Sequence, residues 1–279
     1  MGEVVGRRVR VLSGPRLVSR MSEGDLSRRA LLSLGLSRLR GTAAPAPPPA
    51  RPPRAAEALD PIGLALEQAD LLALSGEPTA ALAELAAPWP GEDLLVVRGG
   101  GLEDRFEDHD GLVAVVEPGE LEDLPFDDAD LDRCLAPFAP AFCAEPRAAL
   151  RELFRVVRPG GHVALATWTA EGAIGRLLQA VADWDPEVDT RLAWGEEGRL
   201  REEIAPHTDQ VSVAVRDIVT HHASPEAAAA AAERALPPVA AALASFPGAD
   251  ANGLRAHAAR LLGADPDGRY LITLARRRG

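Results

Sequence analysis

The sequence predicts an α/β protein with a mostly parallel sheet that carries helices on its faces. Short apolar runs such as Leu94–Val97 and Leu112–Val116 recur along the chain, bounded by glycine, proline or acidic residues. Segments with helical periodicity, such as Ala148–Val157, lie between these runs. Buried strands that alternate with helices are typical of parallel α/β sheets.

Two helices are expected first. Asp60-Pro61 supplies a capping residue and a first-turn proline, and leucines from Leu64 to Leu74 continue the pattern. The next helix is predicted over Thr79–Ala87, before the break at Pro88–Gly91.

Three strands follow. Leu94–Val97 is a continuous apolar run that ends in Arg98 and three glycines. Leu112–Val116 is the second, and Asp130–Leu135, continuing to Phe138, is the third. Their length and continuous apolar character predict strands that are buried on both faces of the sheet.

Helices and strands alternate again in the second half. Leu150, Leu153, Phe154 and Val157 share one face of the predicted helix Ala148–Val157, which stops at Arg158–Gly161. The remaining expected elements are a strand over His162–Trp168, a helix over Gly172–Val181, a strand over Val211–Val219, a helix that starts at Ser224-Pro225-Glu226 and a last strand over Tyr270–Leu274.

Charge and composition divide the chain into a basic leader, residues 1–56, and a folded domain, residues 57–279. The leader has a net charge of +8, whereas the whole chain has a net charge of −12. Its Thr42–Arg54 stretch is a proline-rich linker, so we expect the leader to be disordered. Ser27–Leu32 matches a twin-arginine export signal superficially, but the apolar run behind it is short. Met21 is an alternative start, and a cytoplasmic location is expected.

The acidic body excludes nucleic acid as a partner, because it repels phosphate backbones. No apolar run is long enough to cross a membrane. Cys134 and Cys143 lack metal or redox spacing, and His221-His222 lacks a spaced third ligand, so no metal site is expected. A small-molecule substrate is expected, and a homodimer or a protein partner stays open.

The stretch from Glu120 to Gly172 resembles the class I S-adenosylmethionine (SAM) methyltransferases related to the ubiquinone/menaquinone enzymes (methyltransferase type 11). The matching motifs are the acidic turn Asp123–Phe126, Leu131-Asp132, the helix and turn of Ala149–Gly161, and Thr167-Trp168. The resemblance implies a Rossmann-like three-layer sandwich with SAM as cofactor. It also implies a substrate role for Trp168, although core packing explains that residue equally well.

The cofactor loop departs from the family pattern D-x-G-x-G-x-G. Gly99 and Gly101 match two glycines, but Val97 replaces the acid and Glu103 replaces the last glycine. By the resemblance, Gly99 and Gly101 contact the cofactor, and Ala136, Pro137 and Phe138 lie beside it after the fourth strand. A degenerate loop predicts weakened cofactor binding.

Relatives place two helices and two strands between this loop and the acidic turn, whereas 21 residues, Leu102 to Glu122, fill that interval here. At least one strand–helix unit is therefore missing. In the preferred alignment Leu112–Val116 is the third strand, and Glu120 and Leu121 stand beside the adenine. In the alternative it is the second strand, and Glu117 is the ribose acid.

The expected function is SAM-dependent methyl transfer to a small-molecule acceptor. The alternative is a catalytically inactive relative that acts as a binding or regulatory partner. No catalytic residue is assigned. His207, His221 and His222 are candidates for a general base, and a surface or structural role is the simpler interpretation of each.

Overall fold

The computed structural model describes residues 10–11, 77–139, 143–183, 192–219, 222–246, 248–264 and 267–279. The predicted helix that starts at Pro61 lies outside these ranges, as does most of the predicted leader. The boundary between residues 56 and 57 therefore stays a prediction. Within the leader, β1 (Arg10–Val11) pairs with a strand of the sheet, which departs from the expected disordered arm at these two residues.

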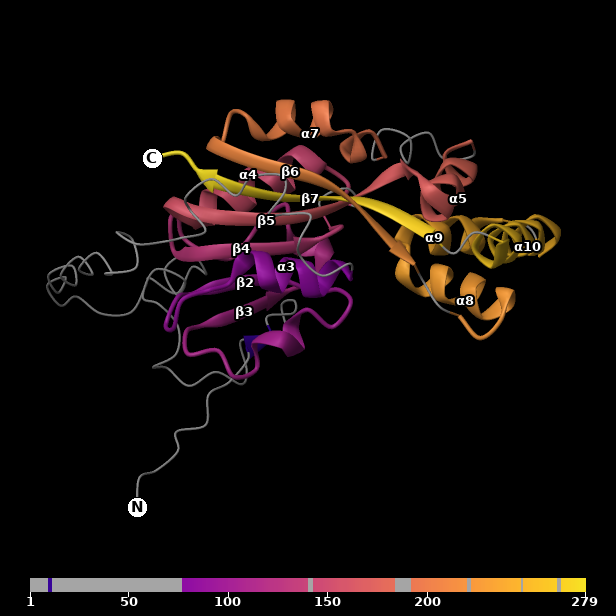
Figure 1. Ribbon diagram of the computed structural model, residues 1–279, viewed down its shortest axis with the longest axis horizontal. Helices are drawn as coiled ribbons and strands as arrows, with labels where there is room; N and C mark the ends of the chain where they lie inside the picture. The colour runs from indigo at the N-terminus through magenta and orange to yellow at the C-terminus, as the bar shows by residue number, and fades with distance from the viewer. Residues whose placement is uncertain are drawn as a thin grey trace, which may run out of the picture.

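A sheet of seven described strands forms the centre of the molecule, in the order β1-β3-β2-β4-β5-β7-β6 (Figure 1). β7 runs antiparallel to β5 and β6, and the other described pairs are parallel, so the mostly parallel sheet is confirmed. The remaining strands are β2 (Leu94–Val97), β3 (Val113–Val116), β4 (Leu131–Pro137), β5 (Val157–Glu171), β6 (Thr208–Val219) and β7 (Asp267–Arg277).

Helices connect these strands. The predicted helices near residues 79–87, 148–157, 172–181 and 224 are confirmed, whereas α7, α9 and α10 were not predicted. The helices are α3 (Pro78–Ala86), α4 (Pro146–Val156), α5 (Gly172–Ala182), α7 (Glu197–Ile204), α8 (Pro225–Ala235), α9 (Pro237–Ser245) and α10 (Gly248–Ala264), with 3-10 turns η3 (Glu103–Phe106), η4 (Pro118–Glu120) and η6 (Ala193–Gly195).

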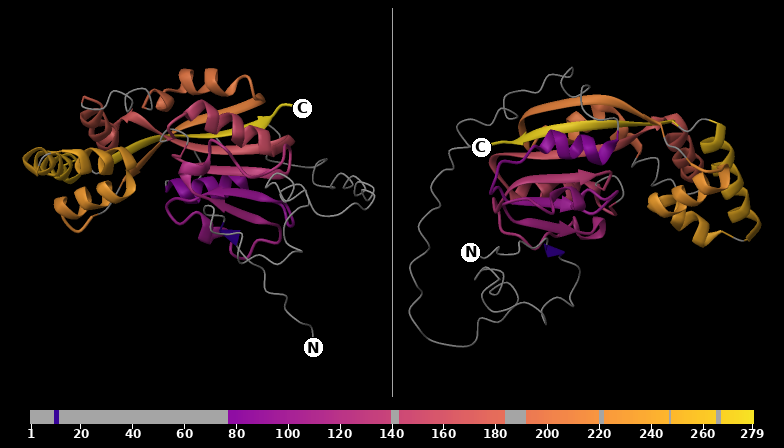
Figure 2. Two further views of the ribbon diagram at one scale, coloured as in Figure 1. Left: turned by 180° about the vertical axis from the view of Figure 1, so that it is seen from behind. Right: turned by 60° about the horizontal axis from the view of Figure 1, so that its bottom comes forward.

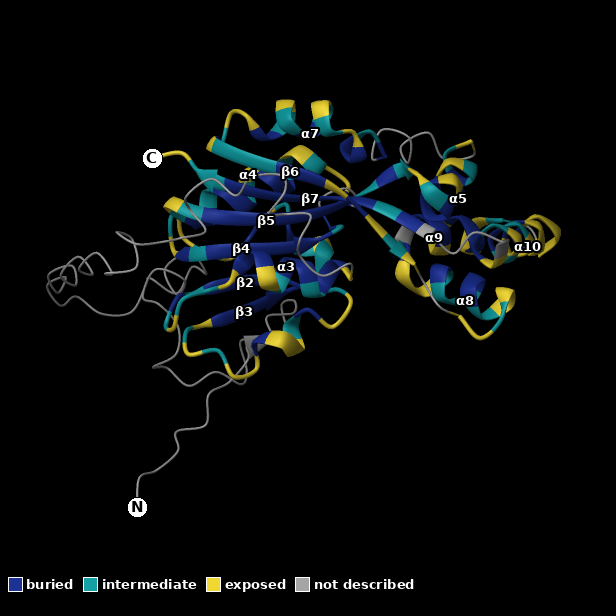
Figure 3. Cartoon of the chain, in the orientation of Figure 1, coloured by how far each residue is buried: buried dark blue, intermediate teal, exposed yellow. Residues whose placement is uncertain are grey.

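The strands bury alternate side chains on the two faces of the sheet. Leu94 and Val96 belong to a core with α3, whereas Leu95 and Val97 belong to a core with α4 and α7. Figure 3 shows the resulting buried centre between exposed outer helix faces. Because each face of a parallel sheet needs a covering layer, this arrangement is the three-layer Rossmann-like sandwich that the sequence predicted.

A helical lobe of α5, α8, α9 and α10 has a core of its own. β5 runs directly into α5, β6 leads toward α8, and α10 leads back to β7. The lobe therefore lies beyond the carboxyl ends of the parallel strands, to one side of the sheet in every view (Figures 1 and 2).

The interval from Leu102 to Glu122 holds only η3, β3 and η4, without an α-helix. The predicted loss of at least one strand–helix unit is thus confirmed. β3 pairs along its whole length with β2, the strand before the glycine loop. In doubly wound sheets the second strand lies beside the first and the third lies one place further out. The preferred alignment, which made this segment the third strand, is therefore wrong about its place in the sheet, and the segment lies where the alternative put it, as the second strand. The place outside it, where the alternative expected a deleted strand, holds β1. The ligand roles of Glu117, Glu120 and Leu121 stay predictions.

The family motif around α4 fastens the acidic turn to the sheet. Glu152 accepts from the backbone N–H of Leu124 at 2.9 Å, and Arg155 donates to the carbonyls of Leu124 and Phe126 at 3.1 and 2.8 Å. Arg155 also contacts Glu152 at 2.7 Å, so one ion pair binds both sides of the turn. These motif residues are structural.

The glycines after α4 are structural too. Gly160 has a φ of 81°, as the predicted turn requires, and a Cβ on Gly161 would lie 2.4 Å from the Asp132 carbonyl oxygen. Among the described residues, no helix is both long and apolar enough to cross a membrane.

Candidate functional site

The glycine loop leaves the carboxyl end of β2 between β4 and α3. Gly100 and Gly101 have φ values of 61° and 72°, which favour glycine. A Cβ on Gly99 would lie 3.3 Å from Pro137 Cγ, and one on Gly100 would lie 2.7 Å from Thr79 Cγ2. The loop therefore keeps backbone, not side chains, at the sheet edge where open α/β folds bind ligands.

The start of α3 lies beside this loop and is already capped. Glu77 accepts from the backbone N–H groups of Thr79 and Ala80 at 3.0 and 2.6 Å, and Arg105 approaches it at 3.2 Å. Burial raises the pKa of Glu77. The hydrogen bonds from Thr79 and Ala80 together outweigh burial, so the pKa of Glu77 lies below its ordinary value. The Glu77 carboxylate already fills the end of the helix dipole that would attract an anion.

Arg98, the residue before the glycines, bridges two acids. Its Nε lies 2.6 Å from Glu117 Oε1, and its Nη1 lies 2.7 Å from Glu103 Oε1. Glu117 directly follows β3, and Glu103 opens η3. The hydrogen bond that Arg98 donates to Glu117 raises the pKa of Arg98 above its ordinary value.

Exposure differs along this chain of charges. The Arg98 and Glu117 side chains are 35% and 43% exposed, whereas Glu103 is 14% exposed. Glu103 Oε2 is buried and has no hydrogen-bond partner among the described residues. The Arg98–Glu103 pair is thus shielded, and the Arg98–Glu117 pair faces solvent.

Glu120 and Leu121, which the sequence placed beside an adenine, close the turn after Glu117. Glu120 uses a carboxylate oxygen to accept from the backbone N–H of Glu117 at 2.9 Å, so it caps η4. The Leu121 side chain is fully buried in the core with α4. The turn presents the Glu117 carboxylate to the loop, and Leu121 offers a ligand only its backbone.

Ala136, Pro137 and Phe138 end β4 in three different ways. The Ala136 side chain is fully buried in the core, whereas Pro137 packs against Gly99. Phe138 is half-buried with a φ of 58°, and its N–H donates to the Ala166 carbonyl at 2.8 Å. Of the three, Phe138 alone turns a large side chain out of the strand.

The Phe138 ring stacks on Trp168, with centroids 4.0 Å apart and an interplanar angle of 6°. Tyr270 lies edge-on to both rings, at 6.1 and 6.3 Å. Burial raises the pKa of Tyr270 to about 12, so the phenol stays protonated. Trp168 touches both the α3 core and the lobe core, so the aromatic cluster joins the sheet edge to the lobe.

The structure describes two of the three candidate histidines, His207 and His222, and they lie on different parts of the fold. His207 precedes β6 and stacks on Phe154 at 5.2 Å, at the amino edge of the sheet and opposite the glycine loop. Burial lowers its pKa. His222 is exposed on the lobe side, and His221 lies outside the described residues. The position of His207 removes it as a base at the glycine-loop edge.

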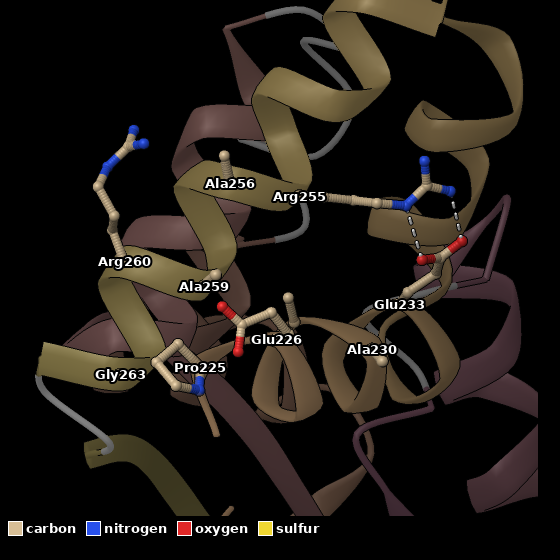
Figure 4. Close-up of a pocket in the computed structure, with 10 residues that line it drawn as sticks. Pro225, Glu226, Ala230, Glu233, Arg255, Ala256, Ala259, Arg260 and Gly263 are labelled. Carbon is tan, nitrogen blue, oxygen red and sulfur yellow. Dashed lines mark hydrogen bonds and ion pairs between the residues drawn. The ribbon is translucent and has the colours of Figure 1, made fainter. Parts of the chain in front are cut away.

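A groove of about 810 Å³ lies between α8 and α10 in the lobe (Figure 4). Alanines line its floor, and Glu233 pairs with Arg255 across it at 3.0 Å. None of the residues that line this groove belongs to the predicted cofactor set. Among the described residues, no group of three or more His, Cys, Asp or Glu side chains could hold a metal ion.

The glycine loop, Glu117 and the end of β4 thus meet at one edge of the sheet. Residues 103–165 match the family model described as "Methyltransferase domain". This part of the chain is therefore similar to that domain. The match begins at Glu103, after the glycine loop, and covers β3, β4, α4 and most of β5.

Two relatives have similarity in short stretches. An uncharacterized protein of Mycobacterium tuberculosis is 34% identical over 91 residues, which cover 31% of this chain and 33% of that protein. Malonyl-[acyl-carrier protein] O-methyltransferase of Erwinia pyrifoliae is 45% identical over 67 residues, 24% of either chain. The matches thus span a third or less of these relatives.

Among solved structures, phosphoethanolamine N-methyltransferase 2 of Haemonchus contortus, in complex with S-adenosyl-L-methionine, has 14% identity and a TM-score of 0.43. The match covers 72% of this chain and 52% of that one. A likeness this distant does not bear on activity or ligand.

Sequence reasoning omitted Arg98 and the Glu103 contact from the site and ranked Glu117 second. One signal was available: Glu117 is the first residue after β3 and follows Gly99 by 18 positions. An acid about 20 residues after the glycine turn is the usual ribose ligand in dinucleotide folds.

Proposed function

We propose that this methyltransferase-domain protein is a SAM-dependent methyltransferase that acts on a small-molecule acceptor and binds its cofactor weakly. The observation that carries the proposal is the meeting of the glycine loop and Glu117 at the carboxyl edge of neighbouring strands. Backbone that can approach a ligand closely, beside an acid that can accept from ribose hydroxyls, is what an adenosine group requires.

The residues present fit that group in part. Gly99 and Gly101 would let it approach the backbone, and Glu117 would accept from the ribose. Phe138, held out of β4, would shield one side from water. Glu120 and Leu121 would lie at the base through the backbone of their turn. Weak binding is expected because Glu117 is already paired and Glu103 fills a glycine position.

When bound, SAM supplies a methyl group on a sulfonium that a nucleophile can attack in line. For such a transfer the protein has mainly to position the acceptor, which can supply several kcal/mol of barrier lowering, up to roughly 7–11 kcal/mol in ideal cases. The helical lobe lies beyond the same strand ends (Figure 1) and would cover the acceptor. We assign no general base.

The alternative is an inactive relative that binds a partner. The Arg98–Glu117 pair favours it, because the carboxylate that would hold ribose has a partner within the chain. In that case the contacts of α4 still stabilise the fold, whereas the Arg98–Glu117 pair occupies the place of the ligand. Under either proposal the protein is cytoplasmic. Mass spectrometry of the mature N-terminus tests whether the leader is removed as an export signal.

Thermal unfolding with and without SAM, supported by calorimetric titration, decides between the two. A site at a hundredfold ligand excess over Kd gains about 2.7 kcal/mol. The melting temperature should then rise by about 5–10 °C. A rise supports the enzyme and directs the next assay to acceptors. An unchanged melting temperature and a flat titration at millimolar SAM would contradict it.

A further inference from the structure

The geometry points to Arg98 as an internal competitor for the ribose-binding carboxylate: an adenosine-type ligand reaches Glu117 only by displacing the Arg98 guanidinium. This inference deepens the proposed function and rests on it. It concerns what sets the affinity of the site.

Glu117 already has a partner in the chain. Its Oε1 already accepts from Arg98 Nε at 2.6 Å, a short charge-assisted hydrogen bond. A ribose held by an acid presents its hydroxyls to the same carboxylate. The carboxylate has two oxygens, and a ribose diol that binds both of them needs Oε1 as well, so the guanidinium and the sugar compete for that oxygen.

Arg98 has a second acidic partner, Glu103. Nη1 stays within 2.7 Å of Glu103, whose side chain is the more buried of the two acids. When a ligand takes Glu117, Arg98 can keep this partner, so its charge is never left unpaired. Displacement breaks the exposed half of the network and spares the shielded half.

The Arg98–Glu117 ion pair should weaken ligand binding only modestly. The Arg98–Glu117 pair is more than a third exposed on both sides, so water and salt weaken it. Competition from such a pair should weaken nucleoside binding by about two- to fivefold. The glycine loop and Arg98 thus act in opposite directions on the same ligand.

The test compares adenosine with 2′,3′-dideoxyadenosine by calorimetric titration of the full chain. Both probes are uncharged, so a change in net charge has no direct pull on either. Arg98→Gln should tighten adenosine binding about two- to fivefold and leave dideoxyadenosine unchanged. Arg105→Gln is the matched control, because it removes the same charge from η3 but contacts Glu77 instead of Glu117. It should alter neither probe.

A second measurement needs no variant that might unfold. Raising the salt from about 0.05 M to about 0.5 M screens the exposed ion pair. Adenosine should then bind the wild-type chain more tightly, relative to dideoxyadenosine. The same salt step should have a smaller effect on Arg98→Gln, whose folding is checked by its unfolding curve.

The outcomes separate the inference from the function. Adenosine binding that is unchanged or weaker in Arg98→Gln overturns the inference, and so does full-strength binding in Glu117→Gln. In both cases the wild-type chain still binds, and the proposed function stands. If neither SAM nor adenosine binds to the wild-type chain or to Arg98→Gln, the proposed function fails, and the inference fails with it.

Discussion

The ring of Phe138 lies flat on the indole of Trp168, with ring centroids 4.0 Å apart. Phe138 holds a left-handed backbone conformation to reach that position, with a φ of 58°. Such a conformation costs about 1–3 kcal/mol in a residue with a side chain and persists only where its surroundings enforce it. The stack and the Phe138 N–H bond to Ala166 supply that enforcement.

Removing the indole should therefore destabilise the junction between sheet and lobe. We expect Trp168→Ala to lower the free energy of unfolding by about 2–4 kcal/mol, below the range for fully buried aromatic residues or at its lower end. Trp168→Phe keeps a ring against Phe138 and should lose about half as much. Urea denaturation measures both. Equal losses in the two variants would show that the stack itself contributes nothing.

Gly195 and Gly198 form a matched pair for backbone approach. A Cβ on Gly195 would lie 2.0 Å from the Trp168 carbonyl oxygen, whereas one on Gly198 meets nothing within 4 Å. Gly195→Ala should cost at least about 3 kcal/mol, because backbone must move. Gly198→Ala should gain about 0.4–1 kcal/mol, since alanine favours the helix α7. Thermal unfolding of both variants checks the contrast, which a stable Gly195→Ala protein would refute.

The buried ion pair of Glu92 and Arg133 should be costly to break on one side only. Arg133 is 2% exposed and its Nε lies 2.8 Å from Glu92. Arg133→Met leaves the buried Glu92 carboxylate without its counter-charge, with the Trp89 N–H still donating to it, and should cost about 3–5 kcal/mol. The double variant Glu92→Gln/Arg133→Met removes both charges and should recover part of that loss. A double variant that is no more stable than Arg133→Met would contradict this account.

Acid should weaken the Glu152–Arg155 ion pair, which holds the turn of residues 123–126. The hydrogen bond from Arg155, which is the largest cause, lowers the pKa of Glu152. A carboxyl group with a lowered folded-state pKa stabilises the fold above its unfolded pKa, and this contribution is lost as pH falls through the folded value. Stability should therefore fall from about pH 5 downward.

Glu152→Gln tests this contribution. The variant should be less stable at pH 7 by about 1–2 kcal/mol and should lose less on acidification than the wild-type chain. Urea midpoints at neutral and acidic pH give both values. Parallel pH curves for the two proteins would show that Glu152 does not contribute to the acid sensitivity.

The sequence predicts the strands and most of the helices because their signals are local. Apolar runs, and the cap Ser224 before Pro225 at the start of α8, are visible in a few consecutive residues. α10 escapes prediction because Asn252 and Gly253 interrupt its helix formers, and contacts with α8 and α5 hold it. The short strand Arg10–Val11 has no sequence signal and exists through its pairing with β3.

The place of β3 in the sheet was mispredicted for a different reason. The distance along the chain from Glu120 to the acidic turn matches the family, but neighbours in a sheet are decided by pairing between distant segments. β3 pairs with β2 although the spacing near the turn fits a third strand. The Arg98 contacts were equally hidden, since Glu103 and Glu117 lie on separate turns that only the fold brings together.

The ion pair of Glu152 and Arg155 lies in the stretch by which such chains are grouped into families. The stretch that matches the family model, residues 103–165, contains this ion pair and excludes the glycine loop. Selection for a foldable scaffold alone would keep that stretch recognisable, whatever happened at the ligand edge. Sequence similarity over this stretch therefore reports a shared fold, and related proteins with different chemistry would still match the same family model.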